Sequence, residues 1–224
     1  MKRRHFNALV CSVCALAAAG SLGHALAQAP AQAASSKLPV VLVVGDSLSA
    51  EYGLKRGTGW VALLSETFAK EKVKARVVNA SISGDTTSGG RSRIAALLKQ
   101  HQPKWVVIEL GGNDALRGLP LNMTRDNLAT MARLSREAGA QVLLLGMEMP
   151  PNYGAKYAQE FREVFTAVAK AEKTALVPFF LKDVADTKDP TALFQNDRIH
   201  PNEAAQPTMR DNVWPELRKL IARR

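Results

Sequence analysis

Short apolar runs alternate with longer amphipathic segments along most of the chain. The runs cover residues 39–44, 75–79, 105–110, 141–147 and 175–180. Most of them are apolar at successive positions and rich in Val, Ile or Leu, which is typical of strands buried on both faces of a parallel sheet. We therefore predict five strands.

The segments between these runs have the length and periodicity of helices. They cover residues 59–71, 90–101, 124–139, 157–173 and 201–223, and three- and four-residue spacing of apolar positions recurs in them. We expect Gly139 to end its helix and Pro201 to open the last one. The alternation predicts a single three-layer α/β/α domain with a mostly parallel, flavodoxin-like sheet of about five strands.

The first 27 residues differ from this pattern and resemble a leader. Lys2, Arg3 and Arg4 precede an apolar stretch without acidic residues, and small residues end the segment at Ala27. We predict a signal peptide at 1–27, a flexible lead-in at 28–37 and the folded domain at 38–224. Export to the periplasm, or alternatively secretion, would follow cleavage near Ala27. An uncleaved membrane anchor is the alternative.

Cleavage would remove much of the reactive chemistry that the composition offers. Both cysteines, Cys11 and Cys14, lie in the leader, and only His101 and His200 remain after it. A chain without thiols has no disulfide, thiol nucleophile or cysteine metal site, and two histidines do not make a multi-histidine metal centre. We expect no metal and no organic cofactor.

The basic charge indicates no particular partner. Taking the three basic leader residues from the 30 Lys and Arg leaves 27 against 20 Asp and Glu, so the net charge of +10 becomes +7. The remaining basic residues are dispersed among acids, apart from a cluster at the C-terminus. We predict no nucleic-acid partner and a monomer, with transient contact to anionic lipid left open.

Ligands of open α/β sheets bind at the carboxyl ends of the strands, so the loops there are searched first for chemistry. Ser47 follows the first predicted strand in Gly45-Asp46-Ser47, where it can act as a nucleophile or cap the next helix. Gly84 and Asn113 follow the second and third strands. Each can belong to an ordinary polar turn, with Asp85 or Thr86 capping the helix after Gly84. Each can also donate a hydrogen bond to an oxyanion, which for a side-chain amide is worth about 3 kcal/mol.

Asp197 and His200 form the remaining candidate pair. Their three-residue spacing allows the carboxylate to bond one imidazole nitrogen, which leaves the other nitrogen as a general base. Such pairs are common on protein surfaces. His101 stands at a predicted helix end, where a solvated role fits better. If the chain uses a histidine base, that base is His200.

Together, these segments resemble the four motif blocks of the SGNH (GDSL) hydrolase superfamily. The matching stretches are GDSLS, ISGDT, GGND and DRIHPN, in the family's order. The likeness covers most of the chain after the leader and is greatest to the bacterial acyl-CoA thioesterase I, protease I and lysophospholipase L1 group, also known as arylesterases. Glu51 and Arg198 stand where glycine is usual in that group, and residues 87–90 replace a more polar stretch.

The resemblance implies a serine hydrolase without a cofactor. It makes Ser47 the nucleophile, His200 the base and Asp197 its orienting acid, with an oxyanion hole built from Ser47, Gly84 and Asn113. The implied substrates are small-molecule acyl esters and thioesters, including aryl esters, lysophospholipids and acyl-CoA-type compounds.

The substrate pocket is a weaker prediction. Leu116, Leu119 and Leu121 could form a wall for an acyl chain and Tyr153 could cover it, or the leucines could belong to the core. A carbohydrate or cell-wall O-acetylesterase on the same fold would have a smaller, more polar pocket. A binding module without activity would lack part of the catalytic set, whereas Ser47 and both of its partners are present.

Overall fold

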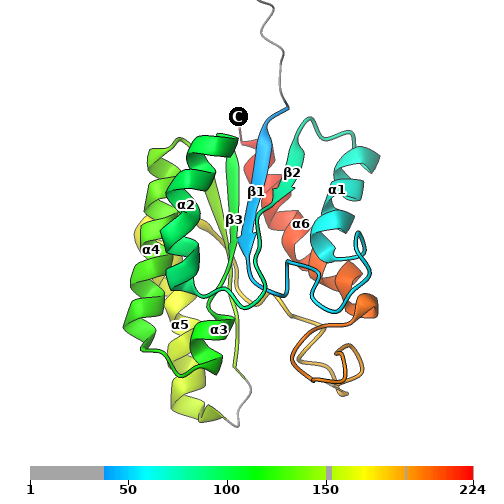
Figure 1. Ribbon diagram of the computed structural model, residues 1–224, viewed down its shortest axis with the longest axis vertical. Helices are drawn as coiled ribbons and strands as arrows, with labels where there is room; N and C mark the ends of the chain where they lie inside the picture. The colour runs from blue at the N-terminus through cyan, green and yellow to red at the C-terminus, as the bar shows by residue number, and fades with distance from the viewer. Residues whose placement is uncertain (1–37, 150–152, 190, 224) are drawn as a thin grey trace, which may run out of the picture. The chain divides into compact units, whose positions relative to one another are not determined.

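The computed structural model describes residues 38–149, 153–189 and 191–223 (Figure 1). The predicted signal peptide, its cleavage point near Ala27 and the lead-in lie outside the described residues. None of the described helices is long and apolar enough to cross a membrane.

Five parallel strands form one sheet in the order β2-β1-β3-β4-β5, as the apolar runs predict. The strands are β1 (Val40–Gly45), β2 (Arg76–Asn79), β3 (Trp105–Glu109), β4 (Gln141–Leu145) and β5 (Ala175–Val177). In register, Val41 pairs with Val77 on one side and with Trp105 on the other. This order is the flavodoxin-like arrangement, in which the switch point lies beside β1.

The strands are unequal in burial and length. Every residue of β1 and β3 is buried, whereas the edge strand β2 exposes Arg76 and Asn79. The prediction that residues 175–180 form a strand is too long, because β5 ends at Val177. Pro178 follows it and has no N–H for a sheet hydrogen bond.

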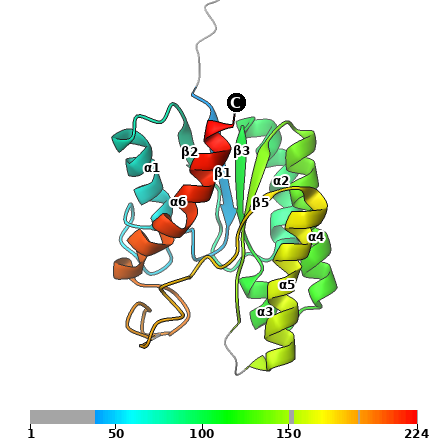
Figure 2. The same ribbon diagram turned by 180° about the vertical axis from the view of Figure 1, so that it is seen from behind.

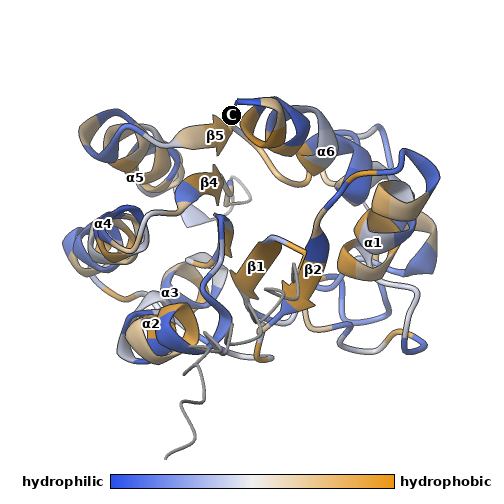
Figure 3. Ribbon diagram, turned by 90° about the horizontal axis from the view of Figure 1, so that it is seen from above, coloured by the Kyte–Doolittle hydropathy of each residue, from blue (hydrophilic) through white to orange (hydrophobic). Residues whose placement is uncertain are grey.

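Helices cover both faces of the sheet. The helices α1 (Trp60–Lys70) and α6 (Gln206–Ala222) pack together on one face, and α2 (Thr87–His101), α4 (Leu121–Glu137) and α5 (Ala155–Glu172) pack side by side on the other (Figures 2 and 3). A short helix that the pattern did not predict, α3 (Gly112–Leu116), begins after Gly111, whose φ is 124°. Five residues are too few to show a helical period.

Several predicted helix boundaries shift, and local hydrogen bonds explain two of the shifts. The helix predicted from residue 90 begins at Thr87, because the Thr86 side chain caps it by accepting from the Gly89 N–H. The prediction that Pro201 opens the last helix is wrong: Pro201 forms an antiparallel bridge with Phe194, and α6 begins at Gln206 after a 3-10 turn. As predicted, Gly139 ends α4, with a φ of 86° that a side chain would strain.

Candidate active site

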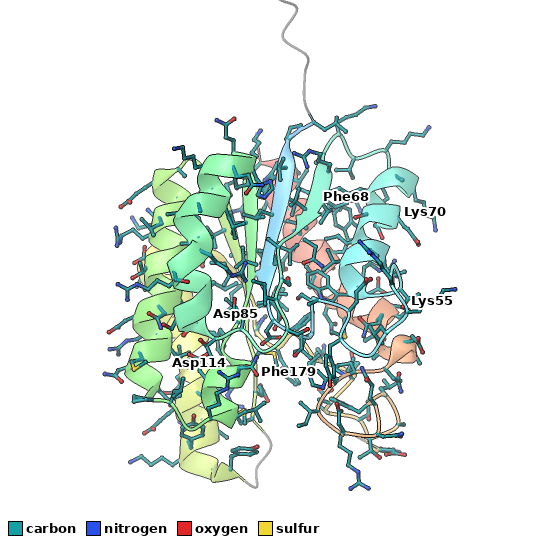
Figure 4. All side chains as sticks on the ribbon, in the orientation of Figure 1. Lys55, Phe68, Lys70, Asp85, Asp114 and Phe179 are labelled. Carbon is teal, nitrogen blue, oxygen red and sulfur yellow. The ribbon has the colours of Figure 1, made fainter. Side chains whose placement is uncertain are left out.

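The loops that leave β1, β2 and β3 meet at one end of the sheet. Asp85, Asp114 and Phe179, which follow β2, β3 and β5, lie toward that end in Figure 4, while Phe68 lies toward the opposite end. Ser47 and Gly84 lie in the loops after β1 and β2, and Asn113 lies in α3. The parallel topology therefore gathers residues that are far apart in the sequence.

The predicted Ser, His and Asp residues form a continuous hydrogen-bonded chain. Ser47 Oγ lies 2.9 Å from His200 Nε2, and His200 Nδ1 lies 2.7 Å from Asp197 Oδ2. A carboxylate can only accept, so Nδ1 carries the hydrogen when the imidazole is neutral, and Nε2 is free to accept the Ser47 proton. This geometry suits general-base activation of a hydroxyl group.

Asp197 is held as a charged carboxylate. Its Oδ1 accepts the backbone N–H groups of His200 at 3.0 Å and Ile199 at 2.9 Å. These backbone hydrogen bonds, together with the one from the imidazole, lower the pKa of Asp197 to about 2. The short spacing between Asp197 and His200 thus also allows the Asp197 carboxylate to accept backbone N–H groups from the residues that follow it.

Asn113 links the loops after β1 and β2. Its Nδ2 donates to the Asp85 carbonyl oxygen at 2.9 Å and to Asp46 Oδ2 at 3.1 Å. Gly84 adopts a φ of 79°, and its carbonyl oxygen accepts from the Arg117 guanidinium at 2.9 Å. Both amide hydrogens of Asn113 already have acceptors. An oxyanion near Nδ2 would therefore share one of these hydrogens with its present acceptor.

Two buried carboxyl groups beside Ser47 were missed by the sequence reasoning. Asp46 is 2% exposed and Glu109 is fully buried at the end of β3. Burial raises the pKa of Asp46 to about 6 and raises the pKa of Glu109 well above its ordinary value. The available signal was the acidic residue at the end of an otherwise apolar strand.

A second set of contacts supports the loop that carries His200. The Tyr52 ring lies 4.4 Å from the His200 ring, centroid to centroid. Gln195 Nε2 donates to the carbonyl oxygens of Tyr52 at 2.9 Å and Pro201 at 3.1 Å, and the Gln195 N–H donates to the His200 carbonyl oxygen at 2.7 Å. No motif or period in the sequence indicated these two residues.

Both single-residue departures from the family pattern occupy left-handed backbone. Glu51 has a φ of 60° and Arg198 a φ of 58°, which explains why glycine is usual at these positions. The Glu51 carboxylate accepts the N–H groups of Gly57 at 3.0 Å and Gly59 at 2.9 Å. These hydrogen bonds offset the conformational strain by fixing the loop between Glu51 and α1.

The predicted substrate residues divide between the surface and the core. Leu116 and Tyr153 are each 41% exposed, and Leu119 is half-buried. Leu121 packs against the core at the start of α4, so it does not extend an exposed wall beside Leu116. Three exposed apolar side chains close in sequence to the candidate site residues were not predicted: Tyr52, Ile82 and Ile199.

The candidate site contains acids and a histidine, but they are not arranged around a cation. Among the described residues, no group of three or more His, Cys, Asp or Glu side chains could hold a metal ion.

Comparison with protein families matches residues 43–206 to the GDSL-like lipase/acylhydrolase family. The esterase TesA of Pseudomonas aeruginosa is 54% identical over 190 residues, which cover 85% of this chain and 92% of the relative. The thioesterase 1/protease 1/lysophospholipase L1 of Escherichia coli K12 is 42% identical over 181 residues, covering 81% of this chain and 84% of the relative.

The fold is shared with a solved esterase. The psychrotrophic esterase EstA from Pseudoalteromonas, in a structure inhibited by monoethylphosphonate, is 41% identical with a TM-score of 0.75. That match covers 80% of this chain and 97% of EstA.

Proposed function

Because the chain belongs to the GDSL-like lipase/acylhydrolase family, and is therefore an ester-hydrolysing enzyme, we propose that Ser47, His200 and Asp197 are its catalytic triad. The observation that carries this assignment is the hydrogen-bonded chain at 2.9 Å and 2.7 Å between these side chains. The family and the ester chemistry come from the comparisons, and the roles of the individual residues are the proposal.

The proposed reaction follows from the positions of these atoms. His200 Nε2 removes the proton from Ser47 Oγ, which attacks the carbonyl carbon of an ester or thioester. Asp197, whose pKa of about 2 keeps it ionised, stabilises the imidazolium that forms. The imidazolium then protonates the departing alcohol or thiol. Water attacks the resulting acyl-serine with His200 again as base, which releases the acid and restores Ser47.

The oxyanion would lie among the three loops that follow β1, β2 and β3. We assign its donors to the backbone N–H groups of Ser47 and Gly84 and to the Asn113 amide. The positive φ of Gly84 and the anchoring of Asn113 to the Asp85 carbonyl oxygen support this assignment. Donors fixed before the reaction stabilise a developing negative charge more effectively than donors that must reorganise.

The surface chemistry favours acyl chains as substrates. Ile82, Leu116 and Ile199 are between 41% and 53% exposed, and each lies within three residues of a proposed catalytic or oxyanion residue. Such side chains would contact the alkyl part of an acyl ester or thioester, as in lysophospholipids or aryl esters of fatty acids. A carbohydrate O-acetylesterase would need polar side chains there, so the alternative is not favoured.

The first experiment tests Ser47. Ser47→Ala is expected to abolish hydrolysis of p-nitrophenyl octanoate without changing the circular dichroism spectrum. Ser65→Ala, which removes a hydroxyl group from α1, is the matched control and keeps full activity. A phosphonate ester should add a single adduct at Ser47. Substantial activity in Ser47→Ala would overturn the assignment.

A second experiment tests the substrate class. Rates on p-nitrophenyl esters from acetyl to dodecanoyl are expected to rise with chain length beyond acetyl. A maximum at acetyl would instead support the O-acetylesterase alternative.

We also propose that the chain is exported and cleaved near Ala27. The basic start, the apolar stretch and the small residues at 25–27 support this. N-terminal sequencing of the protein recovered from the periplasm should begin near Gln28; an intact N-terminus would contradict it.

A further inference from the structure

Two buried carboxyl groups lie beside the turn that presents Ser47. Asp46 is 2% exposed and Glu109 is fully buried, and the Asp46 backbone N–H donates to Glu109 Oε2 at 3.3 Å. Two negative charges in neighbouring positions shielded from water would repel each other, so a proton on one of the two groups is favoured.

The surrounding hydrogen bonds show which group carries that proton. Both oxygens of Asp46 accept hydrogens, Oδ1 from the Leu48 N–H at 3.0 Å and Oδ2 from Asn113 Nδ2 at 3.1 Å. Asp46 thus occupies the position of a carboxylate. Glu109 Oε1 is buried and has no hydrogen-bond partner among the described residues, so no donor stabilises a negative charge there. Glu109 is therefore the group that holds the proton.

The other oxygen of Glu109 accepts hydrogen bonds from residues on either side of Ser47 in the sequence. Glu109 Oε2 accepts from Ser49 Oγ at 2.8 Å and from the Asp46 N–H at 3.3 Å. Ser49 Oγ itself accepts from Trp60 Nε1 at 3.2 Å, which leaves its hydrogen for Glu109. Ser47 is therefore bracketed by two residues that bind the same buried side chain.

Few charges face this pair. His200 interacts electrostatically with Asp46, and the Arg93 guanidinium lies 3.4 Å from the Gly45 carbonyl oxygen. Arg93 is engaged by Asp85 at 2.7 Å, and neither Asp46 nor Glu109 takes part in an ion pair among the described residues. Desolvation and the nearby Asp46 charge accordingly raise the pKa of Glu109.

We propose that Glu109 is a positioning residue, a neutral carboxylic acid that fixes Asp46 and, through it, the Ser47 turn and the Asn113 amide. The protonated pair also carries one negative charge instead of two beside the atoms where the oxyanion develops. This inference rests on the proposed roles of Ser47 and Asn113. Among the described residues Glu109 forms its hydrogen bonds with Asp46 and Ser49 and none with Ser47 or Asn113, so its effect is transmitted through Asp46 and Ser49.

Two variants of similar volume separate this role from packing. Glu109→Gln is uncharged and retains an oxygen that can accept from Ser49 Oγ and the Asp46 N–H, so it should keep kcat within about twofold. Glu109→Met removes this acceptor, and misplacement of the site should lower kcat about tenfold or more with little change in KM. The rate at which a phosphonate labels Ser47 should fall with kcat, while circular dichroism confirms the fold.

A stability measurement tests the proton itself. Folded wild-type protein must hold a proton on Glu109 that the unfolded chain releases above its ordinary pKa of 4.5, so wild-type stability decreases as pH rises. Glutamine has no such proton. Between pH 5 and pH 8, the Tm of Glu109→Gln should therefore rise relative to the Tm of the wild type.

The outcomes distinguish the two proposals. If the phosphonate does not label wild-type Ser47, the proposed function itself fails. If the wild type is labelled and Glu109→Met folds and is labelled at the same rate, only the role of Glu109 is overturned. Equal loss of kcat in both variants, or a Tm difference that does not change with pH, also overturns it. If Glu109→Met does not fold, the pH dependence of Glu109→Gln decides.

Discussion

Two aspartates near His200, Asp197 and Asp46, lie in very different environments. Asp197 binds Nδ1 from a partly exposed loop, and backbone N–H groups keep its pKa near 2. Asp46 lies in the interior, and burial raises its pKa to about 6. The same residue type therefore has a lowered pKa in one position and a raised pKa in the other, because Asp197 remains partly in contact with water whereas Asp46 is almost completely removed from it.

Removing the Asp197 charge tests its role at the residue scale. Asp197→Asn should lower kcat by about 10²–10⁴-fold, because the amide lacks the charge that stabilises the imidazolium and its NH₂ group can donate to Nδ1, which favours the wrong tautomer. Since the folded pKa of about 2 lies below the ordinary 3.8, the carboxylate stabilises the protein above pH 4, and this contribution is lost as pH falls toward 2. Steady-state kinetics and acid unfolding measure the two effects.

Asp189→Asn is the matched control. Asp189 also accepts a backbone N–H, that of Thr191, in the same part of the chain, but it forms no hydrogen bond with His200. Its kcat should equal that of the wild type. A comparable loss in both variants would show that loop structure, and not the imidazole contact, accounts for the effect.

At the scale of elements, two helices on the same face end in left-handed backbone with different residues. α4 is followed by Gly139 with a φ of 86°, and α5 by Lys173 with a φ of 51°. A Cβ at position 139 would contact nothing within 4 Å, so a substitution there changes only the backbone preference. The two helix ends therefore allow the effect of a glycine in left-handed backbone on the free energy of unfolding to be measured in both directions.

Exchanging the residue types should shift stability in opposite directions. Gly139→Ala should lower the free energy of unfolding by about 1 kcal/mol, because a left-handed conformation strains any residue with a Cβ. Lys173→Gly should raise it by up to about 1 kcal/mol for the same reason. Urea unfolding measures both. If Lys173→Gly lowered the free energy of unfolding instead, the interactions of the lysine side chain would stabilise the fold by more than its left-handed backbone destabilises it.

At the scale of the whole molecule, the buried Asp46 couples folding to pH. Its pKa of about 6 in the folded protein exceeds the ordinary 3.8, so folding takes up a proton between these values. Wild-type stability should therefore fall, relative to Asp46→Asn, as pH rises from about 4 to about 6. The size of the loss reports how far burial raises the pKa, since one pKa unit corresponds to about 1.4 kcal/mol.

Global unfolding by urea at several pH values measures this linkage. The two proteins should differ most in slope between pH 4 and pH 6 and become parallel above about pH 7. Curves that remain parallel over the whole range would contradict burial of an ionisable group at this position. The Asp197 contribution does not interfere, because it changes only below pH 4.

The sequence by itself determined the strand and helix order and the four motif segments. Continuous apolar runs identified β1, β3 and β4. A strand that helices cover on both faces is apolar at every position, so it appears in the sequence as an unbroken apolar run. Predictions were less accurate where the local pattern was short, as at α3 and β5, or where a tertiary bridge decided the outcome, as at Pro201.

Only the tertiary structure decided how these parts combine. It brings Ser47 within 2.9 Å of a histidine 153 residues away, and it buries Glu109 beside Asp46 although 63 positions separate them. The physical reason is that side-chain chemistry is local, whereas burial and proximity depend on the packing of the whole sheet. The resemblance of the four motif segments to a known family indicated a hydrolase, but only packing determined which carboxyl groups are charged.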